Sequence, residues 1–543
     1  MKSKQQGLDR RSFMGRGAVA AGVLSGGVLN KAMAAAKNEG SSAGPVVETA
    51  SGKIRGSVVN KIYAFRGVPY GASTAGEGRF MPPLKPQPWT GVKDTIELGI
   101  RSPQLPGGEP PEVIVMDRRE PMGEDCLMLN VWTPSVRGGK RPVILWLHGG
   151  GYATGSAGFI MYDGANFARK QDAVFVGVNH RLNVFGYLYL AGLGGAKYAQ
   201  SANIGQMDII AALEWVRDNI SRFGGDPNNV TICGQSGGGG KVSNLLAMPA
   251  AKGLFHRAII QSGANLRSTT IEDANQSTET FLAKLNLKAN QIDELQKMPM
   301  QQLLDAMKDT QGLRLAPVVD GKTLPAHPFD PAAPEVSANV PILLGSMETE
   351  DTFFAGTPVD DMDDATLHQR VKQALRSDDA DADRMIGVYR RVFSKITNID
   401  VYLKMLADNT RRANAIALAD RKMALAKAPA YLYYFTWRSP IRDGKMKAYH
   451  TLEIPFAFDN VDEAKTMTGD GQERYPLQDR VSGAWAAFAR TGNPSHKGLP
   501  NWPAYNAEQR PTMILNTQCK VVNDPHHEER LALASVKRAG GAA

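Results

Sequence analysis

Cysteine is scarce in this chain: Cys126, Cys233 and Cys519 are the only three among 543 residues. None of them forms a C-x-x-C pair, the spacing that is typical of structural zinc sites and redox motifs. Three isolated cysteines also cannot build a disulfide scaffold. We therefore expect a protein that folds by burying an apolar core, without metal or disulfide staples.

Long apolar runs are also missing, and no stretch reaches the roughly 20 residues that a membrane helix needs. The longest candidate, Gly17 to Leu29, follows the pair Arg10 and Arg11 and precedes the small residues of "KAMAAAK". This arrangement resembles a twin-arginine export signal. We predict a signal peptide over residues 1–36, a linker over 37–45, and a periplasmic or secreted protein without a membrane span.

The chain has no strong excess of charge once this segment is set aside. Its formal net charge is +9, but residues 1–36 hold six lysines and arginines against one aspartate, so the remainder carries about +4. Such a balance predicts neither a nucleic-acid partner nor a membrane partner. The 43% apolar content is that of an ordinary globular protein.

Internal repeats and long low-complexity tracts are absent, and the pattern is one of short apolar strands alternating with helices. The segments "RPVILWLHGGG" (Arg141 to Gly151) and "AVFVGVNHR" (Ala173 to Arg181) are typical of strands buried on both faces of a sheet. An amphipathic helix is predicted from Met207 to Phe223. Alternation of this kind predicts one α/β domain over residues 46–543. Mostly helical insertions are expected at Ile271 to Ala316 and Asp360 to Lys427, over one end of the sheet.

Glycine, in contrast, is concentrated in "GQSGGGG", Gly234 to Gly240. A phosphate-binding loop is excluded because Gln235 stands where its first glycine should be, and Val242 where its hydroxyl should be. A flexible spacer is excluded because a predicted strand, Val230 to Cys233, precedes the motif and a predicted helix begins at Val242. The remaining interpretation is G-x-S-x-G, the strained turn that presents a nucleophilic serine.

This interpretation makes Ser236 the nucleophile, which needs a base and backbone donors for the oxyanion that its attack creates. The motif "HGGGY", His148 to Tyr152, follows a predicted strand as the oxyanion loop of lipases and esterases does. We predict that the N–H groups of Gly150, Gly151 and Gly237 form the oxyanion hole.

With both motifs in place, the chain resembles the type B carboxylesterases, the cholinesterase-like α/β-hydrolases, from about Val46 to about Met513. The resemblance is carried by "FRGVPYG" (65–71), "GEDCLMLNVW" (123–132), "HGGGY" (148–152), "NIGQMD" (203–208), "NISRFGGDPNNVTICGQSGGG" (219–239), "GLFHRAIIQSG" (253–263) and "FARTGNPSHKGLPNWPAY" (488–505). It implies the α/β-hydrolase fold, with a central, mostly parallel twisted sheet flanked by helices.

The resemblance also implies a triad in the order serine, acid, histidine. In "PILLGSMETEDTFF" the acid falls at Glu350, five residues after Gly345, although the neighbouring Asp351 could compete for the role. The block "HTLEIPFAF" gives His450 as the base. His148 is expected to orient the oxyanion loop.

Two departures from the family pattern lead to further predictions. Gly237 stands where relatives often carry alanine, and helix propensity predicts that Gly237→Ala stabilises the fold. Cys126 stands where the family often forms a disulfide, but Ser102 occupies the partner position, so no disulfide is expected. Gln235 replaces a frequent glutamate, a change outside the triad.

The sequence thus predicts a serine hydrolase that acts on a small-molecule substrate, an uncharged or bulky carboxylic ester, with no cofactor and no metal. An amidase or a lactonase would carry the same triad, because the helical insertions are expected to supply the substrate pockets. A non-catalytic cholinesterase-like binding protein is disfavoured, since the triad residues are all present. The oligomeric state cannot be inferred.

Overall fold

The computed structural model describes residues 42–308, 312–354 and 356–536. The predicted export signal, residues 1–36, and the first part of the predicted linker lie outside these residues. The linker prediction is wrong at its end, because strand β1 begins at Ser42 and takes in residues 42–45. The hairpin pairing of β1 with β2 brings this segment into the sheet.

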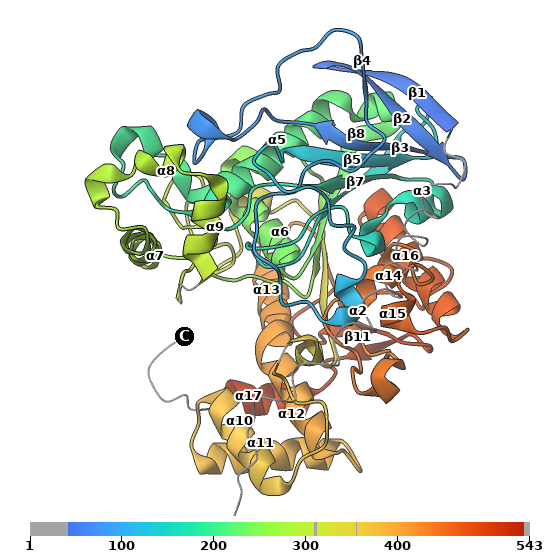
Figure 1. The fold of residues 1–543 in the computed structure, drawn as a ribbon. Helices are drawn as coiled ribbons and strands as arrows, with labels where there is room; N and C mark the ends of the chain where they lie inside the picture. Colours follow the sequence, from blue (N-terminus) through green and yellow to red (C-terminus); the bar gives the residue numbers. More distant parts are fainter. Residues whose placement is uncertain (1–41, 309–311, 355, 537–543) are drawn as a thin grey trace, which may run out of the picture.

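One twisted sheet organises the described residues (Figure 1). Its strand order is β1-β2-β3-β5-β7-β6-β8-β9-β10-β11-β12-β13, with β4 paired to β2. The strands from β7 through β6 and on to β12 are mutually parallel, whereas the β1–β5 end is largely antiparallel and β13 closes the other edge antiparallel to β12. The strands are β1 Ser42–Thr49, β2 Gly52–Val59, β3 Ile62–Pro69, β4 Val92–Asp94, β5 Met128–Thr133, β6 Arg141–Leu147, β7 Val174–Val178, β8 Gly225–Gln235, β9 Arg257–Gln261, β10 Ile342–Met347, β11 Ala430–Phe435, β12 Pro511–Leu515 and β13 Lys520–Asn523.

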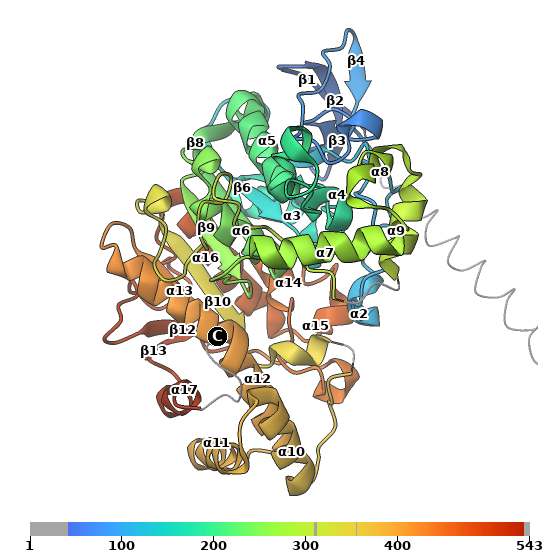
Figure 2. The ribbon, with the colours of Figure 1, turned by 90° about the vertical axis from the view of Figure 1, so that its left-hand side faces the viewer.

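Helices cover both faces of this sheet (Figures 1 and 2). They are α2 Pro111–Ile114, α3 Ala165–Gln171, α4 Asn183–Tyr187, α5 Ile204–Asn219, α6 Gly237–Ala247, α7 Ile271–Lys284, α8 Glu294–Lys297, α9 Met300–Lys308, α10 Asp364–Leu375, α11 Asp379–Val392, α12 Asn398–Ala407, α13 Ala413–Ala424, α14 Glu453–Ala457, α15 Lys465–Thr468, α16 Arg474–Thr491 and α17 His527–Ala534. None of the helices in this described part of the chain is both long enough and apolar enough to cross a membrane.

Strand β6 shows why the sheet needs two covering layers. Val143, Leu145 and Leu147 join the core cluster shared with α5, α6 and α13, whereas Ile144 and Trp146 join the cluster shared with α3, α14 and α16. Side chains alternate between the two faces of a strand, so a strand that is apolar at every position must be buried on both. The predicted central, mostly parallel sheet flanked by helices is therefore confirmed.

The two predicted helical insertions are helical. Helices α7, α8 and α9 occupy the first, and α10 to α13 occupy the second, where a π-helical turn, Asp408–Arg412, joins α12 to α13. Each insertion has a satellite core of its own. Figure 1 shows α10, α11 and α12 at one extremity of the molecule, beside α17.

Candidate active site

Ser236 occupies the turn between β8 and α6. Its backbone has φ 57° and ψ −124°, in the positive-φ region that a residue other than glycine adopts only under strain. The Ser236 N–H donates to the carbonyl of Gln261, at the end of neighbouring strand β9, over 2.8 Å. The parallel sheet thus fixes the turn, and Ser236 lines a cavity at the carboxyl end of the strands.

The glycines around Ser236 are required by close contacts, four with backbone atoms and one with a side chain. A Cβ atom would come too close to a neighbouring atom at each of the five glycines. At Gly237 and Gly238 it would lie 2.1 Å from the Gly151 oxygen and 2.0 Å from the Leu147 oxygen, respectively. The corresponding distances are 2.4 Å from Gly234 to Gly238, 2.9 Å from Gly239 to Gly263 and 2.6 Å from Gly240 to the Tyr152 hydroxyl. Helix α6 begins at Gly237, five residues before the predicted start at Val242. Packing therefore overrides the low helix propensity of this run.

These contacts reverse our sequence-based prediction that Gly237→Ala stabilises the fold. An alanine Cβ would overlap the carbonyl of Gly151, and backbone on both sides leaves little room for relaxation. Overpacking of this kind destabilises a protein by about 1–3 kcal/mol. We expect Gly237→Ala to lower the unfolding midpoint in urea and, by displacing Gly151, to lower kcat by roughly tenfold or more.

Gly387→Ala is a matched control for this substitution. Gly387 lies within α11, and a Cβ there would meet no atom within 4 Å. Only helix propensity then affects stability, so the free energy of unfolding of this variant should rise by about 0.5–1 kcal/mol. Its kcat should equal that of the wild type. A Gly237→Ala protein that gained stability like Gly387→Ala would contradict the contact argument.

His450 and Glu350 meet beside Ser236. Glu350 follows β10, and its Oε2 lies 2.5 Å from His450 Nδ1. The other carboxylate oxygen accepts the Met347 N–H at 2.9 Å, and the Glu350 carbonyl accepts the His450 N–H at 3.2 Å. Both side chains are buried, at 0% and 2% exposure. A carboxylate held on both oxygens can fix one tautomer of the imidazole, leaving Nε2 to act as a base.

Asp351, the alternative acid, takes a different environment. Among the hydrogen bonds of the described residues, none joins Asp351 to His450, and its Oδ2 is buried without a partner. Burial, and the neighbouring charge of Glu350, raise the pKa of Asp351 to about 6, although Arg411 opposes the shift. The geometry therefore favours Glu350 as the partner of His450.

The electrostatics keep the pair in the form that base catalysis needs. Burial would raise the pKa of Glu350, but His450 and Arg411 together bring it below its ordinary value. Burial, assisted by Arg411, lowers the pKa of His450 below 6.5 despite the opposing effect of Glu350. His450 is therefore neutral at pH 7, and Glu350 is ionised.

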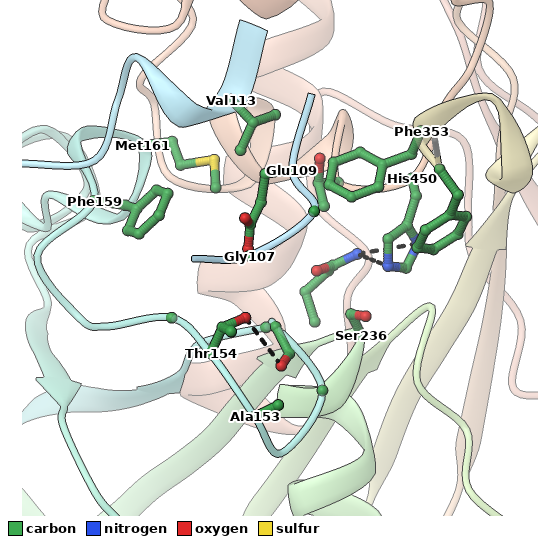
Figure 3. Close-up of a pocket in the computed structure, with 18 of the residues that line it drawn as sticks. Gly107, Glu109, Val113, Ala153, Thr154, Phe159, Met161, Ser236, Phe353 and His450 are labelled. Atoms are coloured by element: carbon green, nitrogen blue, oxygen red, sulfur yellow. Dashed lines mark hydrogen bonds between the residues drawn. The ribbon is translucent and has the colours of Figure 1, made fainter. Parts of the chain in front are cut away.

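Gln235 touches His450, a contact that the sequence did not predict. Its side-chain nitrogen lies 3.3 Å from His450 Nδ1 and 3.2 Å from Nε2 (dashed lines in Figure 3). Across the described residues, no hydrogen bond joins Ser236 Oγ to His450. Catalytic hydrogen bonds are often long without substrate. An amide here, in place of a carboxylate, adds no negative charge beside the imidazole.

Of the predicted oxyanion glycines, Gly150 and Gly151 line the cavity together with Ser236, and Gly237 follows Ser236 as the first residue of α6. The Gly150 carbonyl accepts the N–H groups of Ala153 and Thr154, at 3.2 and 3.0 Å, which turns the loop back on itself. In the described part of the chain, the N–H groups of Gly150, Gly151 and Gly237 donate to no protein acceptor. Gly150 and Gly151 both have positive φ, at 85° and 63°. Three unpaired donors beside one serine can bind a developing oxyanion.

His148 shapes this loop, as expected. Its Nδ1 lies 2.8 Å from the Gly149 oxygen, to which it donates, and its ring stacks on His180 with ring centres 5.0 Å apart. Burial, together with Lys241, lowers the pKa of His148 well below 6.5. His148 is thus a neutral structural residue rather than a base.

A cavity of about 370 Å³ opens onto Ser236. Its apolar lining comes from the chain before and within α2 and from the turn around residues 159–162, with an aromatic pair after β10 (Figure 3). The residues concerned include Val113, Phe159, Met161, Tyr162, Phe353 and Phe354. Among the described residues, none of those that line the cavity belongs to 271–316 or 360–427. The prediction that the helical insertions supply this pocket is therefore wrong. Connecting loops at the carboxyl ends of the strands line the cavity instead.

Of the described residues that line the cavity, Glu109 is the one with an acidic side chain. It forms no ion pair within the described residues, and its carboxylate lies against Gly107 (Figure 3). Burial is the main cause of the raised pKa of Tyr162, and the negative charge of Glu109 raises that pKa further. No motif marked Glu109 or the aromatic pair Phe353 and Phe354 in the sequence.

The described residues contain no cluster of three or more His, Cys, Asp or Glu that could hold a metal ion.

The family comparison agrees with this geometry. The model of the carboxylesterase family matches residues 43–534. The chain belongs to the carboxylesterase family. It is 35% identical over 508 residues to para-nitrobenzyl esterase of Bacillus subtilis (strain 168), covering 90% of this chain and 98% of that one. It is 33% identical over 497 residues to phenmedipham hydrolase of Pseudarthrobacter oxydans, covering 87% of this carboxylesterase and 95% of the relative.

Solved carboxylesterase structures share the fold. A Geobacillus stearothermophilus carboxylesterase has a TM-score of 0.78 at 34% identity, covering 90% of this chain and 99% of its own. An esterase from Clostridium hathewayi has a TM-score of 0.79 at 31% identity, covering 92% and 100%. Together with the family match, these likenesses identify the protein as a carboxylic ester hydrolase.

The cysteines of this carboxylesterase are all free, as predicted. Cys126 is buried, and so is Ser102, whose hydroxyl accepts the Leu182 N–H at 3.1 Å. Burial raises the pKa of the Cys126 thiol to about 12. A serine thus fills the place of a disulfide partner, and the thiol stays protonated and unreactive at neutral pH.

Proposed function

We propose that this carboxylesterase cleaves small uncharged carboxylic esters through an acyl-enzyme formed on Ser236. The observation that carries the proposal is the 2.5 Å contact between His450 and Glu350 at the cavity that Ser236 lines. His450 Nε2 takes the Ser236 proton as Oγ attacks the ester carbonyl, and then gives it to the departing alcohol. Water repeats the sequence and releases the acid.

Glu350 and the loop glycines have supporting roles in this proposal. Glu350 holds the imidazole in the tautomer with a proton on Nδ1 and stabilises the imidazolium that forms. The N–H groups of Gly150, Gly151 and Gly237 bind the oxygen as it becomes negative. Removing one such donor typically costs about 3 kcal/mol of barrier. These donors are preorganised by the backbone contacts of α6, so no rearrangement is needed as charge develops.

The cavity lining favours neutral substrates. Its apolar and aromatic walls bind hydrocarbon, and the unpaired carboxylate of Glu109 repels a second negative charge. The neutral acyl and alcohol groups of a compact ester fit a volume of about 370 Å³.

A panel of p-nitrophenyl, alkyl and aromatic-acid esters tests this function, run beside the matched p-nitroanilides and lactones. We expect ester turnover to exceed anilide and lactone turnover. Failure to release acid from any ester, with the protein folded, would contradict ester hydrolysis. Preferential cleavage of the anilides or lactones would contradict the ester preference.

Glu109→Gln sharpens the substrate prediction. Half-esters of dicarboxylic acids, which carry one free carboxylate, should have lower kcat/KM than methyl-capped diesters of similar size. Glu109→Gln should raise kcat/KM for the half-esters by roughly three- to tenfold while changing the diesters little. An equal change for both substrate classes would show that Glu109 does not select against charge.

Export remains a proposal from the sequence. Arg10 and Arg11 precede a short apolar run in the segment that lies outside the described residues. Periplasmic localisation of the full chain, lost on changing both arginines to lysine, would support it.

A further inference from the structure

Lys241 is a buried cation behind the oxyanion loop. It lies in α6, five residues after Ser236, and its side chain is 0% exposed. None of the ion pairs found in the described part of the chain includes it. Nothing in the proposed acyl-transfer steps uses a lysine at this place.

The Lys241 side chain spans the loop that carries the oxyanion donors. Its Nζ donates to the carbonyl oxygen of His148 at 3.0 Å, and it lies 5.9 Å from the centre of the Tyr152 ring. His148 immediately precedes Gly149, and Tyr152 immediately follows Gly151. Lys241 therefore holds both ends of the glycine loop against the helix that begins at the nucleophile.

The groups that face Lys241 are all neutral. His148 at the end of β6 and His180 after β7 have pKa values lowered by burial and by the Lys241 charge. The pKa of Tyr152 is raised by burial, and its hydroxyl accepts the Asn244 amide at 3.1 Å. Tyr187 of α4 packs on Tyr152, and its pKa is also raised, mainly by burial. Among the described residues, no ion pair offsets the charge of the Lys241 ammonium group.

An unpaired buried cation destabilises a fold. Burial accordingly lowers the pKa of Lys241 to about 7. Costs of this kind are concentrated at functional sites, where a charge appears during the reaction. The only anion that acyl transfer creates on this side of Ser236 is the oxyanion.

We propose that Lys241 is a positioning residue for acyl transfer, whose ammonium group fixes the oxyanion loop and whose charge stabilises the oxyanion across it. The inference rests on the proposed function of Ser236 and the glycine N–H groups. It assigns a role to a residue that does not touch the substrate.

Lys241→Met tests it, because methionine keeps the volume and removes the charge. We expect kcat for neutral esters to fall by about tenfold, with KM changed less than about threefold. We also expect stability to rise, most strongly below pH 7, where the wild-type lysine is charged. The gain should shrink as pH rises toward 10.5, because the unfolded lysine then loses its proton as well.

Lys422→Met is the matched control. Lys422 of α13 is also buried, at 2% exposure, and its Nζ donates to the Ser337 and Ala338 carbonyls. Burial lowers its pKa to about 8. It lines no part of the Ser236 cavity. Its replacement should leave kcat unchanged.

Lys241→Gln separates charge from hydrogen bonding, since glutamine can still donate to the His148 carbonyl. We expect it to lose kcat as Lys241→Met does. In the wild type, kcat should fall above about pH 7 as Lys241 loses its proton, and this alkaline limb should be absent from both variants. If Lys241→Met does not fold, Lys241→Gln carries the same test.

Wild-type kcat and an unchanged pH profile in Lys241→Gln would overturn the inference. That result would leave the proposed function intact, because Ser236→Ala tests the latter independently. A Lys241→Gln enzyme whose kcat falls about tenfold, while its KM stays within about threefold of wild type, would support it.

Discussion

Ser236→Ala should lower kcat/KM for neutral esters by about 10⁵-fold, leaving only the modest catalysis that the oxyanion donors and binding provide. The physical reason is that no other hydroxyl occupies the turn between β8 and α6, where strain and the Gln261 hydrogen bond hold Ser236 at the cavity. The fold should not change, since alanine fits the same volume. Initial rates with a p-nitrophenyl ester, and the urea midpoint, check both statements.

Ser262→Ala provides the matched control. Ser262 stands at the corresponding end of the next strand, β9, also at positive φ, 47°, and its N–H donates to the Gly345 carbonyl at 2.9 Å. Its hydroxyl does not line the cavity. This variant should keep activity within about threefold of wild type, since it touches no reacting atom. A Ser236→Ala enzyme as active as Ser262→Ala would end the nucleophile proposal.

Glu350→Gln should lower kcat/KM by about 10⁴-fold, because an amide favours the wrong tautomer of His450 and cannot stabilise the imidazolium. The 2.5 Å contact and the full burial of Glu350 leave no room for water to substitute. Steady-state kinetics with the same ester measure the loss.

Asp351→Asn distinguishes the two candidate acids. Asp351 is adjacent in the chain and partly buried, but it makes no hydrogen bond to His450 within the described residues. We expect its replacement to change kcat/KM by no more than a few fold. If Asp351→Asn lost activity and Glu350→Gln kept it, the acid would have been assigned to the wrong carboxylate.

The contiguous motifs made much of the site predictable from sequence. Ser236 and the glycines proposed for the oxyanion hole lie in two short segments whose strand and helix neighbours are readable from apolar patterning. The helical insertions were likewise readable. These features depend on local periodicity and turn chemistry.

The remaining features depend on contacts between distant segments. Helix propensity predicts that Gly237→Ala stabilises the fold, because propensity takes no account of the Gly151 carbonyl that lies against Gly237. The late predicted start of α6 has the same cause. Sequence patterning predicts a cavity lined by the helical insertions, because loops such as 106–113 carry no periodic signal.

Buried polar residues were the hardest to assign. The sequence pattern around Lys241 does not distinguish it from any other residue of a helix. Its contact with the His148 carbonyl forms only when β6 and α6 pack together. Gln235 was recognised as a departure from the family, but its approach to the imidazole of His450 requires β8 and the segment after β11 to meet.

The most direct test of the central claim is to find the acyl group on Ser236. The enzyme would be quenched in acid during turnover of p-nitrophenyl trimethylacetate, an ester whose bulky acyl group slows deacylation, and its peptides analysed by mass spectrometry. We predict one trimethylacetyl group on the peptide that contains "GQSGGGG", at Ser236, and none in Ser236→Ala. An active enzyme whose Ser236 stays unmodified, or whose acyl group sits on another residue, would contradict the account.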